Sequence, residues 1–292
     1  MKKFIALCAA LALLLLAGCT MPTGYTAPPD TTGTPSTTAA PSIGSVPARI
    51  VSLSPRITEV LADLGVTDHL VGADTNSISR LNLTGVTGLD MINFSAEQII
   101  ALNPDLVLAD GINAMSGDDL TSVDAAGIKV VRTSDYNTLA DIENDILVIG
   151  QAVNVSAQGL VDTMKQQLAE LTITTDTPKT VYFDIGDSYT FGSQSYINEL
   201  LALAGAKNIF ADQNVSYFQS SGEDVIAANP DVIFTSCDYI PDPVAEIKSR
   251  PGFDALSAVQ NNRVYLLDVN LISTPNHHLV DALRQIEQYL NQ

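Results

Sequence analysis

The chain has 292 residues, of which 46% are hydrophobic, and carries 14 Lys and Arg against 33 Asp and Glu, a formal net charge of −19 at pH 7. This acidity argues against nucleic acid or an anionic lipid surface as a ligand, because both would repel the chain. Its three cysteines offer neither a disulfide framework nor a cysteine-based metal site.

The first 19 residues are typical of a signal peptide. Lys2 and Lys3 form a charged start, and the apolar run over 4–16 is too short for a membrane-spanning helix. The run leads to Leu-Ala-Gly-Cys over 16–19, which resembles the lipobox of bacterial-type lipoproteins. We therefore expect a lipid on Cys19, an extracytoplasmic location, and contact with the cell membrane through that anchor only. An ordinary cleaved signal peptide is the alternative.

Residues 20–46 are rich in Thr, Pro, Ser and Gly and have almost no bulky apolar side chains. Such a composition cannot form a core, so we expect a disordered linker. The roughly 245 residues that follow show regular apolar patterning and are enough for two modest lobes.

A fourteen-residue segment occurs twice, at 95–108 and at 221–234, with seven identical positions. Each copy predicts a short helix that begins at a serine cap, ends at Asn-Pro and leads into a buried strand. The duplication indicates two similar lobes, and two lobes predict a ligand cleft between them.

The repeat extends upstream, because a strand over 48–53 and a helix over 58–65 have counterparts over 179–184 and 198–205. Further strands are expected at 127–131 and 262–267, and a last helix at 279–290. Strands that alternate with helices and carry uninterrupted apolar runs indicate parallel sheets covered on both faces. The predicted fold class is α/β, with two similar doubly wound lobes whose sheets are mostly parallel.

Residues 138–172 keep helical spacing of apolar side chains, and we expect Asn154 and Ser156 to break the stretch and cap the second helix. We interpret 138–177 as a connector, with the two lobes joined by a long rigid helix, between an N-terminal lobe over 47–137 and a C-terminal lobe over 178–292. A helical connector is stiff, so we expect little closure of the lobes.

Five segments stand in a fixed order: Val-Ser-Leu-Ser-Pro-x-x-Thr-Glu over 51–59, Glu-x-Ile-x-Ala-Leu-Asn-Pro-Asp-Leu-Val over 97–107, Ile-Asn-Glu-Leu-Leu-x-Leu-Ala-Gly-Ala-Lys-Asn-Ile-Phe-Ala-Asp over 197–212, Arg-Pro-Gly-Phe over 250–253, and Val-Tyr over 264–265. Together they resemble the substrate-binding lipoproteins of ABC importers for cobalamin, ferric siderophores and haem. The resemblance covers nearly all of the chain after the linker. It implies a protein that captures a small metal chelate and delivers it to membrane-spanning importer subunits with an associated ATPase.

In that family one glutamate from each lobe docks on the membrane-spanning subunits. The matching residues are Glu97 and Glu223, which occupy the same place in the two copies of the repeat. Both lie in the first turn of a predicted helix, where the helix dipole favours a carboxylate. The alternative is that they are only favourable first-turn charges.

Ligands of open α/β sheets bind beyond the carboxyl ends of the strands. The loops expected there carry polar and aromatic side chains suited to a large planar or macrocyclic ligand, with ordinary packing as the alternative for each. The candidates are Asn76 and Phe94 in the first lobe and Tyr189, Phe191, Tyr217, Phe218 and Tyr239 in the second.

Two departures from the family pattern add candidates. Arg56 follows Ser-Pro at a helix start, where the family often has a small residue, and we expect it to face an anionic group of the ligand rather than a local carboxylate. The chain reads Thr-Pro-Asn-His-His over 274–278, where the family commonly has an arginine-rich segment. His277 or His278 is expected either to be an axial ligand to the metal of a bound chelate or to cap the last helix.

Other functions fit less well. Gly-Asp-Ser over 186–188 is similar to a serine hydrolase motif, but no Asp-x-x-His follows near the C-terminus, so we expect no catalytic residues. A zinc or manganese scavenger needs several convergent histidines, and the chain has only three. We therefore expect no cofactor, no metal bound by the protein alone and no enzyme activity. A stand-alone surface sensor or interaction protein that uses the same cleft is the alternative to an importer component.

Overall fold

The computed structural model describes residues 44–111, 113, 120–134 and 136–292. The expected signal peptide, Cys19 and most of the expected linker lie outside the described residues. Residues 43–292 form one compact unit. In the part of the chain that is described, no helix combines the length and apolar character needed to cross a bilayer.

The first lobe contains a five-stranded sheet in the order β3-β2-β1-β4-β5, with every neighbouring pair parallel. This order is that of doubly wound α/β sheets. The strands are β1 (Ile50–Ser52), β2 (Leu70–Asp74), β3 (Thr87–Leu89), β4 (Leu106–Ala109) and β5 (Lys129–Arg132). The helices are α1 (Pro55–Asp63), α2 (Thr75–Leu81), α3 (Ala96–Ala101) and α4 (Leu120–Ala125), with a 3-10 turn η1 (Thr67–His69).

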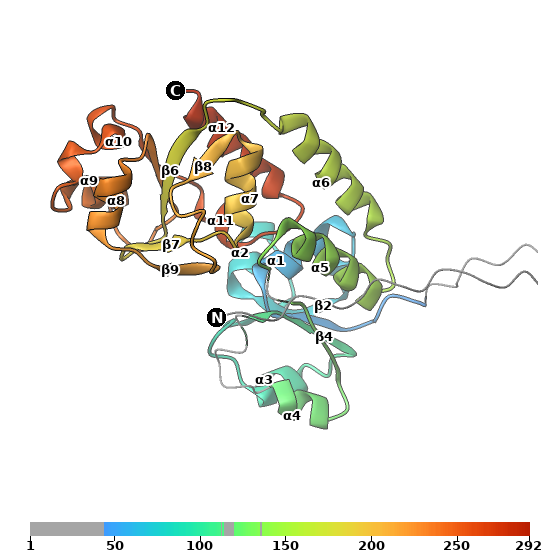
Figure 1. Ribbon diagram of the computed structural model, residues 1–292. Coiled ribbons are helices and arrows are strands. Elements are labelled where there is room, and N and C mark those ends of the chain that lie inside the picture. The colour runs from blue at the N-terminus through green and yellow to red at the C-terminus, as the bar shows by residue number, and fades with distance from the viewer. Residues whose placement is uncertain (1–43, 112, 114–119, 135) are drawn as a thin grey trace, which may run out of the picture. The chain divides into compact units, whose positions relative to one another are not determined.

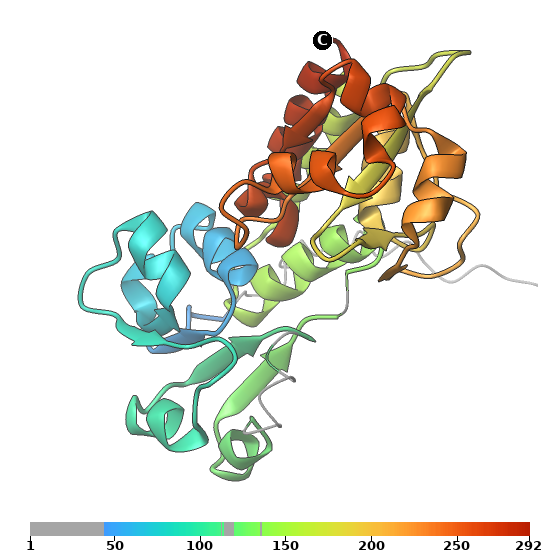
Figure 2. The same cartoon turned by 90° about the vertical axis from the view of Figure 1, so that its left-hand side faces the viewer.

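Helices cover both faces of this sheet, with α1 and α2 on one side and α3 and α4 on the other (Figures 1 and 2). Side chains alternate between the faces along each strand. Ile50 and Leu106 therefore pack with α1, whereas Val51 and Val107 pack with α3 and α4. The uninterrupted apolar runs of the sequence follow from burial on both faces, as predicted.

The second lobe has a six-stranded sheet in the order β11-β10-β6-β7-β9, with β8 also paired to β6. The strands are β6 (Lys179–Asp184), β7 (Tyr189–Phe191), β8 (Ala206–Asn208), β9 (Tyr217–Gln219), β10 (Val232–Thr235) and β11 (Val264–Leu266). The helices are α7 (Tyr196–Leu203), α8 (Gly222–Ala228), α9 (Pro243–Ser249), α10 (Ser257–Gln260), α11 (Val269–Ser273) and α12 (Leu279–Leu290), with a 3-10 turn η3 (Phe253–Ala255).

The parallel strands β8-β6-β10-β11 repeat the pattern of β2-β1-β4-β5. Helices again cover both faces of the sheet, with α7 and α12 on one side and α8, α9 and α10 on the other (Figure 1). The second lobe differs by the antiparallel pair β7–β9, which joins the sheet where β6 ends, at Asp184 opposite Thr190. The predicted fold class of two similar, mostly parallel lobes is confirmed.

The two copies of the repeat agree in backbone detail. Ser95 caps α3 by accepting a hydrogen bond from the Gln98 N–H, and Ser221 caps α8 by accepting one from the Asp224 N–H. After both helices the Asn that precedes Pro is left-handed, with φ 47° in one copy and 44° in the other. Asparagine tolerates this conformation because its side chain bonds locally. The predicted Asn-Pro stop therefore works in the same way in both lobes.

The connector consists of two helices, α5 (Leu139–Ala152) and α6 (Gln158–Leu171), rather than one long helix. The chain turns between them at Asn154, which has φ 58°, as the sequence predicts. The cap of α6 is Ala157, however, and not Ser156. Ile142 of α5 and Met164 of α6 belong to one buried cluster that also contains Ile50 and Val181, so a continuous core links both sheets to the connector.

Candidate functional site

A strained turn follows β6 at the carboxyl edge of the second-lobe sheet. Gly186, Asp187 and Ser188 all have positive φ, at 103°, 50° and 63°. Asp184 holds this turn, because its buried carboxylate accepts hydrogen bonds from the Gly186 N–H at 2.9 Å and the Tyr182 hydroxyl at 2.9 Å. Backbone of this kind persists only where surrounding contacts fix it, and it occurs often in ligand sites.

Tyr239, in the loop after β10, lies over this turn. A Cβ atom at Gly186 would be 1.9 Å from the Tyr239 Oη atom, so only glycine leaves room for the phenol. The side chain is 65% exposed. A hydrogen bond with the Cys237 thiol, followed by partial burial, raises the pKa of Tyr239 to about 12. The phenol is therefore a neutral group at ordinary pH and is held in place at the sheet edge.

The β7–β9 pair presents two more tyrosines. Tyr189 is 41% exposed and Tyr217 is 65% exposed. Phe191 and Phe218 instead pack inward, with ring centroids 5.4 Å from Phe183 and 5.3 Å from Phe210 respectively. The aromatic surface expected of the second lobe is thus made by tyrosines, while both phenylalanines on this pair serve the core.

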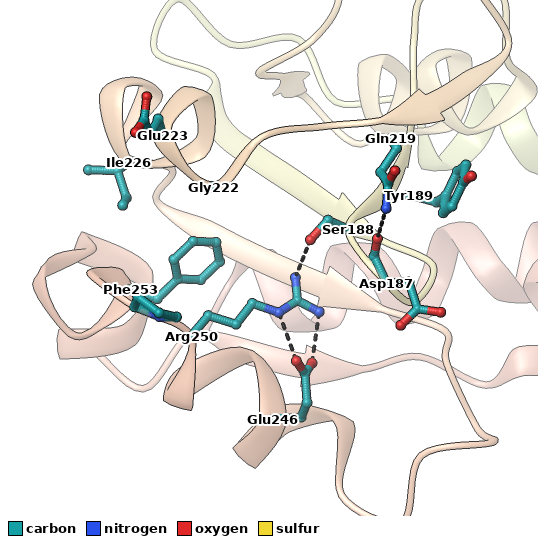
Figure 3. A pocket seen from close by; sticks show the side chains of 11 residues that line it. Asp187, Ser188, Tyr189, Gln219, Gly222, Glu223, Ile226, Glu246, Arg250 and Phe253 are labelled. Atoms are coloured by element: carbon teal, nitrogen blue, oxygen red, sulfur yellow. Dashed lines mark hydrogen bonds and ion pairs between the residues drawn. The ribbon is translucent and has the colours of Figure 1, made fainter.

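An open hollow of about 960 Å³ adjoins this edge (Figure 3). Its lining comes from the strained turn, the β7–β9 pair, α8, α9 and the segment that follows α9. The lining residues are Asp187, Ser188, Tyr189, Gln219, Gly222, Glu223, Ile226, Glu246, Arg250, Pro251 and Phe253.

Arg250 supplies the positive charge in this hollow. Its Nη1 atom lies 2.6 Å from the Asp184 carboxylate, and its Nε and Nη2 atoms lie 3.0 and 2.7 Å from Glu246. Burial favours the neutral guanidine, but the hydrogen bonds to Glu246 and Asp184 hold the pKa of Arg250 above its usual value. Arg250 belongs to the Arg-Pro-Gly-Phe motif of the sequence, but it was not predicted as a site residue. The small number of cations in this acidic chain was the feature that could have indicated its role.

Ser188 lacks the environment of a nucleophile. Its Oγ atom lies 3.5 Å from Arg250 Nη1, a group that donates and cannot act as a base (Figure 3). The histidines nearest the C-terminus bond Asp63 instead. The geometry around Ser188 therefore gives no support to a hydrolase.

Glu97 and Glu223 occupy equivalent places on the first turns of α3 and α8, and both side chains are exposed. Within the described residues, neither carboxylate takes part in an ion pair. Glu223 also lines the hollow beside Arg250 (Figure 3). The structure therefore presents both predicted docking residues to solvent in matching local settings.

The two ligand-binding candidates Asn76 and Phe94 of the first lobe differ in their exposure to solvent. Asn76 is exposed in the first turn of α2, next to the capping residue Asp74. Phe94 is 4% exposed and packs in the core beneath α3 and α4, so its expected place on the ligand surface is wrong. An aromatic residue just before a helix cap packs onto the helix when its next turn is apolar, as with Ile99 here.

The expectation that Arg56 faces a ligand is also wrong, since this residue is 3% exposed and fully engaged. Nε lies 3.0 Å from Asp110, Nη1 lies 3.0 Å from Asp145 on α5, and Nη2 donates to the Thr133 hydroxyl. The guanidinium also lies 4.6 Å from the ring centroid of Tyr136. Burial of an arginine requires such pairing, and this network ties α1, β4 and the connector together.

His277 and His278 meet the first lobe. Their Nε2 atoms lie 2.6 and 2.8 Å from Oδ2 of Asp63, the last residue of α1. His278 occupies the N-cap position of α12, as the capping prediction expects, but its side chain makes no capping hydrogen bond. Burial, with the nearby charge of His278, lowers the pKa of His277 despite the opposing effect of Asp63. A role as axial ligand to a bound chelate stays a prediction.

Comparison with known proteins identifies the family. Residues 50–271 match the family model described as periplasmic binding protein. The chain is 32% identical over 253 residues to an uncharacterized ABC transporter substrate-binding lipoprotein, YvrC, of Bacillus subtilis strain 168, covering 83% of this chain and 79% of that protein. It is 30% identical to the vitamin B12-binding protein of Vibrio cholerae, covering 83% and 88%.

Among solved structures, the apo form of the periplasmic heme-binding protein RhuT from Roseiflexus sp. RS-1 superimposes with a TM-score of 0.73 at 26% identity, covering 84% of this chain and 98% of that one. The resemblance found in the sequence motifs is thereby confirmed, and so is its extent over nearly all of the described chain. The chain belongs to the periplasmic binding protein family, which is a family of binding proteins rather than enzymes.

Proposed function

We propose that this protein is the extracytoplasmic substrate-binding lipoprotein of an ABC importer, and that it captures a cobalamin, a ferric siderophore or haem. The observation that carries the proposal is the exposed tyrosine surface of Tyr189, Tyr217 and Tyr239 at the carboxyl edge of the second sheet. Tyr189 lines the large open hollow, and its amphipathic ring together with those of Tyr217 and Tyr239 suits a bulky, partly planar ligand with polar edges. The lipid on Cys19 would keep the protein beside its importer.

The docking proposal rests on Glu97 and Glu223. A carboxylate on the same turn of the same repeated helix in each lobe suits a partner built from two equivalent subunits. Exposed carboxylates that lack an ion pair within the described residues lose little on meeting arginines of the partner. Such charge pairs set recognition and the rate of association.

Two measurements on one set of proteins test the function. Equilibrium titration of the purified chain with cobalamin, haem and a panel of ferric siderophores should give saturable binding with one of these classes. Uptake of that ligand by cells should fall at least tenfold in the variant Glu97→Arg/Glu223→Arg, because the charge reversal repels the partner while the ligand surface is untouched. The affinity for the ligand should stay within about twofold of the parent.

The matched control is Glu170→Arg, which reverses an exposed charge on α6 outside the repeat. It should leave both uptake and affinity unchanged. Loss of affinity in the double variant would overturn the docking assignment, and absence of binding to every chelate would overturn the proposed ligand class. If the purified chain binds the ligand but cells take up that ligand equally well with and without the chain, the sensor alternative is favoured.

A further inference from the structure

A mixed cluster of histidine and carboxylate joins the two lobes away from the tyrosine surface. Asp63 ends α1 in the first lobe, and His277 and His278 directly precede α12 in the second. One ring nitrogen from each histidine lies within 2.8 Å of the same carboxylate oxygen. None of the three residues lines the hollow beside Arg250.

The three side chains converge in the manner of a metal site. One donor atom from each residue lies within 4.8 Å of the donor atoms of the other two. Neighbouring residues in a chain usually point apart, yet the rings of His277 and His278 have centroids 4.1 Å apart and an interplanar angle of 38°. Two imidazoles and one carboxylate are a ligand set that Zn²⁺ accepts, with a fourth position left to solvent.

The cluster has room to adopt coordination geometry. Bonds of about 2.0–2.1 Å at a tetrahedral angle place neighbouring donor atoms about 3.3 Å apart. The present Nε2–Oδ2 distances of 2.6 and 2.8 Å are those of hydrogen bonds, so the donors must separate by about 0.5–0.7 Å. Asp63 and His278 can move, because their side chains are 43% and 45% exposed, whereas His277, at 9%, is the fixed member.

The surroundings favour a cation that stays in contact with solvent. A cavity of about 230 Å³ adjoins the cluster and is lined in part by His278, Glu59 and Asp281. The adjacent seam already carries polar contacts between the lobes. The Asn276 amide of the second lobe donates to Glu59 of the first lobe at 2.5 Å, and Glu59 also pairs with Arg80 within the first lobe at 2.6 Å.

We propose that Asp63, His277 and His278 bind one divalent transition-metal ion, best matched by Zn²⁺, which clasps the two lobes together. This metal is held by the protein itself and is separate from any metal inside a transported chelate. The inference does not depend on the proposed function, since none of its ligands belongs to the tyrosine surface or to the docking pair.

The test is calorimetric titration of the full chain, purified without a histidine tag and freed of metal by a chelator, with ZnCl₂. One ion should bind per chain. Asp63→Ala and His278→Ala should each weaken binding at least tenfold, because two ligands remain in place of three. Both positions are half-exposed, so neither substitution removes core packing, and far-ultraviolet circular dichroism checks that the fold is kept. His69→Ala removes the only other histidine of the chain and should leave the affinity unchanged.

Amide hydrogen exchange tests the clasp. Zn²⁺ should slow exchange both at 61–66, at the end of α1, and at 274–280, and should do so in the parent chain only. Absence of saturable binding, or equal binding by Asp63→Ala and the parent, would overturn the site. Binding that protects 274–280 alone would show a metal held by the histidines without the first lobe, and would overturn the clasp.

Discussion

The buried Arg56 gives the sharpest prediction of stability. Arg56→Ala removes a guanidinium that pairs with Asp110 and Asp145, whose side chains are 3% and 2% exposed. After the substitution Asp110 keeps a hydrogen bond from the Ser54 hydroxyl at 2.5 Å, and Asp145 keeps two from Ser134. The substitution removes the cation shared by both ion pairs, so each buried carboxylate loses the compensation that the guanidinium supplies.

Removal of one partner of a buried ion pair costs about 3–5 kcal/mol. Natural domains have about 5–15 kcal/mol of total stability, so the variant loses a large fraction of its margin. For a chain of this size such a loss corresponds to a decrease of about 6–20 °C in Tm. Because Asp145 lies on α5, part of the effect is a weaker attachment of the connector to the first lobe.

Urea unfolding followed by circular dichroism measures this free energy. Arg132→Ala is the matched control, because Arg132 pairs with Asp124 at the same 3.0 Å with side chains 44% and 45% exposed, and its loss should cost at most about 1 kcal/mol. Combining Arg56→Ala with Asp110→Asn and Asp145→Asn should recover part of the lost free energy of unfolding, since the two buried carboxylate charges are removed as well. A cost for Arg56→Ala equal to that of the control would refute the reasoning.

Two further predictions concern the strained turn. Gly186→Ala should destabilise the chain by about 1–3 kcal/mol in urea unfolding, because φ is 103° and the new Cβ displaces the phenol of Tyr239, and ligand affinity should fall with it. The pKa of the Tyr239 phenol should be about 12, above its ordinary value of 10.0, as measured by the difference in ultraviolet titration between the parent and Tyr239→Phe. Cys237→Ala should return this pKa toward 10. Since the unfolded chain loses this proton first, rising pH between those values should reduce stability. A difference signal between the parent and Tyr239→Phe that rises near pH 10 would contradict the assigned hydrogen bond.

Local patterns predicted the fold well because they act within a few residues. The glycines at 65 and 205 both follow helices with left-handed φ, 72° and 68°, as expected of helix ends. The serine caps of α3 and α8 and the bounds of α12 also follow from short-range spacing. Because these local signals occur twice in the same order, the sequence predicts two similar sheets even though the contacts between distant residues are not known.

The site was predicted less completely because its partners are far apart in sequence. Arg56 meets Asp145 across 89 positions, and His277 meets Asp63 across 214. Local sequence spacing does not predict contacts between residues so far apart. Arg56 was therefore predicted to face a ligand, and one prediction for the two histidines was a helix cap. The β7–β9 pair was expected to be two loops, since three-residue strands are too short to show alternation.

The two lobes share the residues of the docking proposal and differ in the residues of the proposed ligand surface. Glu97 and Glu223 stand on equivalent helices, so a partner with two similar subunits meets two similar surfaces. The β7–β9 pair has no counterpart among the described strands of the first lobe. Tyr189 and Tyr217, two of the three exposed tyrosines of the candidate surface, come from this pair. Substitutions there should therefore change which chelate is bound while leaving the interaction with an importer intact.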